Sequence, residues 1–398
     1  HGEIGELVWS PDGSTIAFTF AKSNQPLDDD GNPKEPGVRR ITKKWYKMQG
    51  KGFIDDEYRQ IWLVDVVSGA TRQLTATEYN HNSLNWTPDG DALIFGANPT
   101  ESDDYDIGQE KMYLQRLDES AATEILKQKE GPAELPRLSP DGNLVAYIGH
   151  TDPEEVWGAA HRHLWITSLD GTQAPRNVNP DFDRTIGSMM VNDAGHPEGT
   201  GAPVWAPDGK TIYCPVSDAG SVHLYKYDLE DDAFSLLDDS TADLLSPKLD
   251  DSGRNLVCLR GDATTLADVY HRNMKSGEWS RLTESNDDIL DEREVDTPAC
   301  HWFDGVNGKV QGWIMKPVGY EEGNKYPGIL EVHGGPRAMY GDSFFFEFQL
   351  LASLGFAVFY CNPSGSQGYS ESFARSIMNA WGDADYKDCM AATDFFEQ

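Results

Sequence analysis

The sequence predicts a β-propeller followed by an α/β domain, and three observations support this prediction. A short turn motif occurs five times between Trp9 and Gly253, and each copy precedes a stretch typical of a β-strand. After about residue 289 the repeat stops, and apolar strands alternate with helical patterns. No apolar run reaches the roughly 18 residues of a membrane-spanning helix.

The repeated motif is a tight turn between two strands. Its clearest copy is Trp9-Ser10-Pro11-Asp12-Gly13, which the apolar run 15–20 follows. Proline presets the backbone for a turn, and aspartate and glycine suit the next positions. The five copies end at Gly13, Gly90, Gly142, Gly209 and Gly253, and the last copy lacks the proline.

Each repeat also contains a second hairpin, so that one repeat supplies four strands. In the first repeat, residues 60–65 and 71–75 flank a turn at Ser68-Gly69. Four antiparallel strands form one propeller blade, and blades stack because a single blade cannot bury both of its faces. We therefore predict a propeller over residues 1–288 with about five recognisable blades. A closed ring needs more blades, and we expect the missing ones before His1.

Residues 289–398 are predicted to form a second domain. Alternating strands and helices imply a parallel sheet that is covered on both faces. The predicted strands are 295–303, 309–316, 326–333 and 356–360, and the predicted helices are 344–354, 371–380 and 383–398.

The most informative motif of this domain is His333-Gly334-Gly335-Pro336, which ends the apolar strand 326–333. An α/β-hydrolase takes one oxyanion-hole donor from the loop after such a strand. Glycines allow a backbone N–H to approach the carbonyl oxygen that becomes negative in the transition state. An ordinary strand-ending turn is the alternative interpretation, and the strand–helix alternation that follows favours the oxyanion loop.

Two further stretches follow this motif: Asn-Pro-Ser-Gly-Ser-Gln-Gly-Tyr at 362–369, and Trp381-Gly382 with Asp385 and Asp388. Together with the repeated turns and residues 333–336, they resemble the prolyl oligopeptidase family, in which a β-propeller precedes an α/β-hydrolase domain, and within it the acylaminoacyl-peptidase branch. Ser364 stands where the family usually has Arg, and Ser370 where it usually has Gly.

The resemblance implies a serine-type peptidase that hydrolyses short or N-acylated peptides through an acyl-enzyme. It assigns the backbone N–H of Gly335 to the oxyanion, in a loop that His333, Gly334 and Pro336 complete. The nucleophile and its Asp and His partners follow in that order in this fold. No Gly-x-Ser-x-Gly motif occurs, and Ser366 lacks the flanking glycines. The triad is therefore expected beyond Gln398, and the chain is interpreted as a fragment that is inactive alone.

Two other functions stay open: a non-catalytic propeller that binds or scaffolds, and an esterase of the same fold. The predicted second domain favours a hydrolase over a scaffold. Acylaminoacyl, dipeptidyl and endopeptidase specificities are all compatible with the sequence. Glu154-Glu155 could hold a substrate amine as in dipeptidyl peptidases, but an inserted blade loop is the preferred interpretation.

Composition excludes several partners. The net charge of −33, from 66 acidic and 33 basic residues, opposes binding to nucleic acid or to anionic membranes. The five scattered cysteines predict reduced thiols and a cytoplasmic protein. We expect no cofactor and no metal, because the loop 28–32 lacks the closing Glu of a calcium site and His161 and His163 suggest a surface role. The sequence is compatible with a homo-oligomer.

Overall fold

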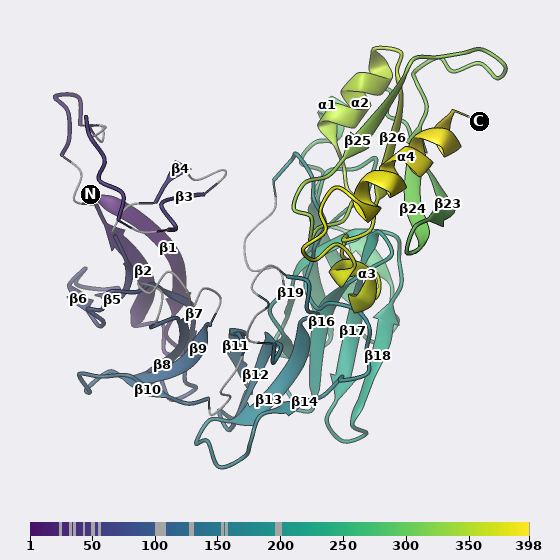
Figure 1. Ribbon diagram of the computed structural model, residues 1–398. Coiled ribbons are helices and arrows are strands. Elements are labelled where there is room, and N and C mark those ends of the chain that lie inside the picture. The colour runs from purple at the N-terminus through teal and green to yellow at the C-terminus, as the bar shows by residue number, and fades with distance from the viewer. Residues whose placement is uncertain are drawn as a thin grey trace. The chain divides into compact units, whose positions relative to one another are not determined.

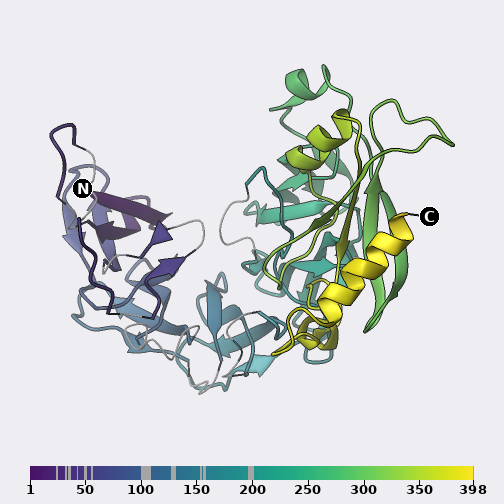
Figure 2. The same ribbon diagram turned by 45° about the horizontal axis from the view of Figure 1, so that its top comes forward.

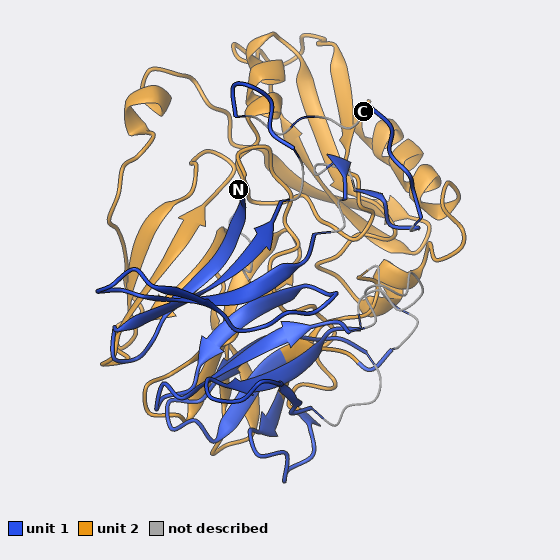
Figure 3. Cartoon of the chain, turned by 90° about the vertical axis from the view of Figure 1, so that its left-hand side faces the viewer, with its two compact units in different colours: residues 1–147, 151–156, 166–176 blue, residues 148–150, 157–165, 177–398 orange. Residues whose placement is uncertain are grey.

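The computed structural model forms two compact units, which are described separately (Figure 3). Unit 1 contains residues 1–147, 151–156 and 166–176, and unit 2 contains residues 148–150, 157–165 and 177–398. The residues that the structure describes are 1–23, 26–31, 34, 37–42, 44–48, 52–54, 57–99, 109–126, 131–152, 155, 158–195 and 201–397.

Most of the chain folds into four-stranded sheets, as the repeats predict (Figure 1). In five of these sheets the strands lie side by side in the order in which they occur along the chain. A short hairpin of β3 (Lys47–Met48) and β4 (Gly52–Phe53) interrupts the first. The five sheets comprise β1 (Gly2–Trp9), β2 (Thr15–Lys22), β5 (Arg59–Asp65) and β6 (Thr71–Gln73); β7 (His81–Trp86), β8 (Ala92–Ala97), β9 (Lys111–Arg116) and β10 (Thr123–Glu124); β11 (Ala133–Leu138), β12 (Leu144–Gly149), β13 (His163–Ser168) and β14 (Arg176–Asn177); β15 (Val204–Trp205), β16 (Thr211–Asp218), β17 (Ser221–Asp228) and β18 (Ala233–Asp238); and β19 (Asp243–Leu249), β20 (Asn255–Gly261), β21 (Asp268–Asn273) and β22 (Trp279–Arg281).

The repeated motif forms the turn between the first two strands of each of these sheets. In the first turn, the Asp12 carboxylate accepts bonds from the Ser10 hydroxyl at 2.6 Å and from the Ser14 N–H at 3.0 Å. These bonds lower the pKa of Asp12 to about 2, with the bond from Ser10 contributing most. All five turn glycines have φ between +64° and +76°, which only glycine adopts freely. The interpretation of the repeat as a turn motif is confirmed.

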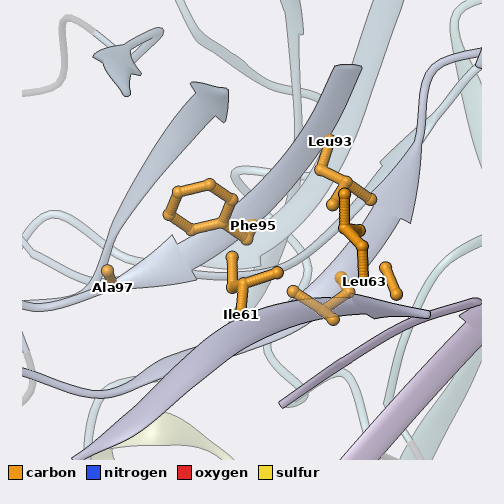
Figure 4. Close-up of a cluster of buried hydrophobic side chains, with 7 residues drawn as sticks. Ile61, Leu63, Leu93, Phe95 and Ala97 are labelled. Carbon is orange, nitrogen blue, oxygen red and sulfur yellow. The ribbon is translucent and has the colours of Figure 1, made fainter. Parts of the chain in front are cut away.

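Within unit 1, the first two sheets pack face to face through an apolar core (Figure 4). Ile61 and Leu63 of β5 meet Leu93, Phe95 and Ala97 of β8. Each large side chain buried in this way contributes about 1.5–3 kcal/mol to stability relative to exposure. Alternate residues of a strand point to opposite faces, so each sheet has a second face to cover, as stacked propeller blades do.

The sixth sheet differs from the predicted parallel sheet. Its strand order is β23 (Ala299–Gly305), β24 (Gly308–Met315), β26 (Ala357–Asn362) and β25 (Gly328–Val332), and only β25 and β26 are parallel. The two-residue turn between β23 and β24 can only produce an antiparallel pair. The crossover between β25 and β26 carries helix α2 (Phe346–Ser353), which permits a parallel pair.

Helices cover both faces of this sheet, as predicted. Tyr360 of β26 packs with Phe348 of α2 on one face. Helix α4 (Ala384–Phe396), yellow in Figure 2, lies on the other face. There the next strand residue, Cys361, packs with Ala392 of α4. Because successive residues of a strand point to opposite faces, β26 packs against both helices.

The remaining helices are short. Helix α1 spans Asp287–Leu290, and α3 spans Glu371–Arg375 rather than the predicted 371–380. After α3 the chain continues with backbone bonds three residues apart, as from Met378 to Arg375, so the α-helical ladder ends there. In the described part of the chain, no helix has both the length and the apolar character needed to cross a bilayer.

Candidate functional site

The site lies where β25 and β26 end. The two strands are parallel and in register, with Val332 opposite Cys361. Parallel strands end at the same edge of a sheet, so the loops that follow them meet there. The structure thus brings together the two segments that the sequence pointed to separately, the 333–336 loop and the 362–369 loop.

His333 is buried and connects the two loops. Only 9% of the residue is exposed. Its Nδ1 lies 2.9 Å from the carbonyl oxygen of Gly334, and its Nε2 lies 2.9 Å from the hydroxyl oxygen of Ser366. The Tyr340 ring packs edge-on against the imidazole at 5.1 Å between centroids. Burial lowers the pKa of His333 below its ordinary value, although hydrogen bonds partly oppose this shift.

Gly335 presents a backbone donor at the edge of this site. The residue is exposed and has φ +128°. Within the described part of the chain, no acceptor is bonded to its N–H. A Cβ at Gly335 would lie 3.0 Å from the backbone nitrogen of Arg337, whereas a Cβ at Gly334 would meet nothing within 4 Å. The peptide bond from Gly335 to Pro336 is cis.

Asn362 holds the far end of the 333–340 segment. Its Oδ1 accepts a bond from the Tyr340 N–H at 2.7 Å, and its Nδ2 donates to the Tyr340 carbonyl at 2.8 Å. Nδ2 also donates to the hydroxyl of Tyr369, which donates to Gln311 of β24 at 2.7 Å. Burial raises the pKa of Tyr369, so the phenol stays protonated and keeps this donor.

The glycines of the 362–369 loop allow it to pack closely against its neighbours. A Cβ at Gly365 would lie 2.3 Å from Ile377 Cδ1, and one at Gly368 would lie 2.4 Å from Met339 Sδ. The N–H of Gln367 also donates to the carbonyl of Ala338 at 2.9 Å. The two loops are therefore joined by backbone as well as by side chains.

Asp388 anchors the same loop to α4. Its carboxylate is fully buried. One oxygen accepts the N–H of Val306 at 2.6 Å, and the other accepts the N–H and hydroxyl of Ser364 at 2.8 and 2.5 Å. Asp385, in contrast, caps the exposed turn at Gly382 with a 2.8 Å bond. The substitution of Ser364 for the usual Arg is thus accommodated by a hydroxyl on a buried carboxylate.

A cavity of about 310 Å³ opens beside these loops. Polar groups from three segments line it, together with the apolar end of β25. Its lining residues are Val332, His333, Pro336, Pro363, Ser364, Ser366, Asp385, Tyr386 and Cys389.

The other residues that the sequence singled out lie elsewhere. The Asp28 carboxylate bonds the N–H of Asp30 at 3.0 Å, which is a local turn. The surface role predicted for His161 is wrong, because the residue is only 1% exposed. Its Nδ1 lies 3.4 Å from Oδ1 of Asp183, and burial lowers the pKa of His161 to about 4. Glu154 lies outside the described residues, as does Asn32 of the 28–32 loop.

Sequence reasoning missed how Ser366 and Asn362 act. The sequence pattern points to Ser366 only as a possible nucleophile, whereas in the structure its hydroxyl is hydrogen-bonded to the His333 ring. Asn362 was noted as part of a motif without a role. The available signal was that both loops follow neighbouring parallel strands.

Part of the chain matches a known protein family. A sequence profile of the prolyl oligopeptidase family matches residues 342–398, which include α2, β26 and the 362–369 loop. The chain thus carries, over these residues, the sequence signature of the prolyl oligopeptidase family. The resemblance seen in the sequence is thereby confirmed at the level of the family.

Curated proteins match nearly the whole chain. A Bacillus subtilis (strain 168) protein, uncharacterized peptidase YuxL, is 29% identical over 398 residues, covering 98% of this chain and 59% of that protein. Dipeptidyl-peptidase 5 of Porphyromonas gingivalis is 24% identical over 419 residues, covering 99% of this chain and 57% of that protein. The chain therefore spans less than two thirds of the length of these relatives.

Solved structures share the fold. An acylaminoacyl peptidase in complex with Z-Gly-Gly-Phe-chloromethyl ketone superposes with a TM-score of 0.75 at 23% identity, covering 99% of this chain and 56% of that one. The uncomplexed Pyrococcus horikoshii acylaminoacyl peptidase gives 0.73 at 24% identity, with the same coverage. The likeness supports the propeller-type arrangement of the four-stranded sheets.

Proposed function

We propose that this chain is part of a serine-type peptidase that hydrolyses short or N-acylated peptides through an acyl-enzyme. The observation that carries the proposal is the N–H of Gly335, an exposed residue in the loop after β25, which has no hydrogen-bond acceptor among the residues that the structure describes. The family signature and the peptidase names of the relatives support it. Because the chain spans part of its relatives' length and contains no Gly-x-Ser-x-Gly, the nucleophile belongs to sequence outside residues 1–398.

The chemistry requires a donor where negative charge develops. When a serine attacks a peptide carbonyl, the oxygen becomes an oxyanion, and backbone N–H groups at about 2.7–3.1 Å stabilise it. The Gly335 N–H supplies one such donor, and the residue after the nucleophile supplies the second in this fold. Glycine at 335 lets the carbonyl approach without meeting a side chain.

We assign residues 1–288 to a propeller and residues 289–398 to the opening part of an α/β-hydrolase domain. The mixed sheet with α2 and α4 on opposite faces supports the second assignment. In this family architecture the propeller limits access, so we propose short peptides as substrates. The acylaminoacyl branch is favoured, because two acylaminoacyl peptidase structures superpose on nearly the whole chain.

We infer a cytoplasmic location from the cysteines. All five are free thiols, and Cys214, Cys258 and Cys361 are buried. Unpaired thiols are typical of reducing compartments. Fractionation of the source cells tests this inference.

The test compares three chromogenic substrates on the gene product that contains this chain: an N-acylated amino acid anilide, a dipeptide anilide with a free amine, and an acyl ester. We expect the acylated anilide to be hydrolysed with the highest kcat/KM. Preferential cleavage of the dipeptide would assign the dipeptidyl specificity, and cleavage of the ester with neither anilide hydrolysed would contradict the peptidase proposal.

Two glycine variants test the oxyanion role. Gly335→Ala strains a residue with φ +128° and displaces its N–H, so kcat should fall by about 10²-fold or more. Gly37→Ala is the control, because it lies outside this loop and a Cβ there meets nothing within 4 Å. Equal activity of both variants and the wild type would rule out Gly335 as the oxyanion donor.

A further inference from the structure

The contacts of the His333 ring define where its protons lie. Nδ1 is 2.9 Å from the Gly334 carbonyl oxygen, which can only accept a hydrogen bond. A proton on Nδ1 makes this contact a hydrogen bond. Burial lowers the pKa of His333 and so favours a neutral ring, in which a proton on Nδ1 leaves a lone pair on Nε2. The group that can donate to it is the Ser366 hydroxyl, 2.9 Å away.

The Ser366 hydroxyl has a second neighbour, the carbonyl oxygen of Pro363 at 2.7 Å. One hydroxyl proton cannot serve both acceptors fully. If the hydroxyl donates its proton to Nε2, the Pro363 carbonyl loses that donor, and if it donates to Pro363, Nε2 must carry a proton and donate to Oγ. The state of the hydroxyl is thus tied to the state of the ring.

The Gly334 carbonyl and the Gly335 N–H belong to one peptide group. This peptide is trans, so the carbonyl and the N–H point in opposite directions. A peptide between two glycines has little intrinsic preference, because neither residue has a Cβ. The bond from His333 to the Gly334 carbonyl therefore determines the direction of the N–H at Gly335.

We propose that Ser366 is a positioning residue whose hydroxyl holds His333 in the Nδ1–H form, so that the ring aims the N–H of Gly335. This inference rests on the proposed oxyanion role of Gly335. It extends the site to the loop after β26 and gives Ser366 a function in turnover without contact with substrate.

The surroundings of Ser366 fit positioning rather than nucleophilic attack. The residue is only 1% exposed. The backbone on both sides is held, with the Gly365 N–H bonded to the Phe373 carbonyl at 3.1 Å and the Gln367 N–H to the Ala338 carbonyl at 2.9 Å. These backbone bonds therefore hold the Ser366 hydroxyl beside the His333 ring.

Ring nitrogens can be observed directly by two-bond ¹H–¹⁵N correlation on protein labelled with ¹⁵N-histidine. His333→Gln identifies the His333 signals. At pH 7.5 we expect the wild-type ring to be protonated at Nδ1 alone. Ser366→Ala should lose this single pattern and show a mixture of both neutral forms. A wild-type ring protonated at Nε2 alone, or an unchanged pattern in Ser366→Ala, would overturn the proposal.

Ser364→Ala is the matched control. Ser364 lies in the same loop and lines the same cavity, but its hydroxyl bonds Asp388 and not His333. We expect the His333 pattern of this variant to match that of the wild type. A change as large as that in Ser366→Ala would mean that general disturbance of the loop, and not the lost bond, explains the result.

Kinetics on the gene product that contains this chain provide the second readout. Ser366→Ala should lower kcat roughly tenfold and leave KM unchanged, as expected when only transition-state stabilisation is lost. Ser366→Thr, which keeps a hydroxyl, should restore the ring pattern and most of kcat. Covalent labelling of Ser366 by a fluorophosphonate would instead make it a nucleophile and overturn the proposal. If the wild type hydrolyses no peptide, the peptidase assignment fails, while the ring pattern still decides the role of Ser366.

Discussion

The side chain of Asn362 pairs with both backbone groups of Tyr340, accepting its N–H at 2.7 Å and donating to its carbonyl at 2.8 Å. The amide thus acts like one residue of a neighbouring strand. Both residues are buried, so neither bond can be replaced easily by water. This pair fixes the end of the loop that starts at His333.

Replacing Asn362 by Ala should destabilise the unit that contains it. The Tyr340 N–H and carbonyl would lose their partners in a buried site, which costs about 1–3 kcal/mol for each group. We expect the free energy of unfolding to fall by about 2–4 kcal/mol in urea. Asn324→Ala removes a bond to Glu321 in an exposed turn and should change it by less than about 0.5 kcal/mol. Similar losses for both variants would contradict the role of this pair.

Replacing the Asp388 carboxylate by a neutral amide should reduce stability more than the same change at Asp383, an exposed carboxylate at the start of α4. In Asp388→Asn, one acceptor oxygen becomes an NH₂ group that faces an N–H donor, at Val306 or Ser364. We expect a loss of about 2–4 kcal/mol, since bonds to buried charged groups are the strongest of this kind. Asp383→Asn, which removes an exposed pair with Lys387, should cost less than about 1 kcal/mol. Calorimetry that ranks the two variants equally would refute this expectation.

Asp342 should make stability depend on pH. Burial raises the pKa of Asp342 to about 6, and Asp262 and Asp243 add to the shift. The folded state therefore binds the proton more tightly than the unfolded chain does, and stability falls as pH rises from about 4 through 6. Asp342→Asn keeps an acceptor for the Ser221 hydroxyl without the buried charge.

The variant should consequently gain stability relative to the wild type between pH 5 and pH 8, by about 1.4 kcal/mol at most. Urea denaturation at the two pH values measures this difference. Asp304→Asn at an exposed pair with Lys309 serves as the control and should show little pH dependence. If the stability difference between Asp342→Asn and the wild type is the same at pH 5 and pH 8, the raised pKa of Asp342 is contradicted.

The repeated turns supply a stabilising substitution. In three copies a hydroxyl accepts the N–H that begins the next strand, as Ser139 does from Leu144 at 2.9 Å. The fourth copy has Ala206 at this position, with the same backbone bonds to Thr211 and Gly209. Ala206→Ser should add about 0.5–1.5 kcal/mol, and Ser139→Ala should lose a similar amount. Thermal unfolding that shows a loss for Ala206→Ser would mean that the turns are not equivalent.

Local chemistry explains what could be predicted. The five turns need only Pro, Asp and Gly in sequence, and the φ values of their glycines follow from that. The strand 326–333 and its glycine-rich end were likewise found from adjacent residues. The predicted parallel sheet was only partly right, because a two-residue turn makes β23 and β24 antiparallel.

The sequence by itself therefore determined the repeat, the order of strands and helices along the second domain, and the loop at Gly335. Only the tertiary structure decided which side chains serve that loop. Ser366 is 33 residues from His333, and Asp388 is 82 residues from Val306. Such pairs form because the strand order of the sheet places the ends of β25 and β26 side by side. The periodicity of apolar residues along the chain predicts strands but not their order in the sheet.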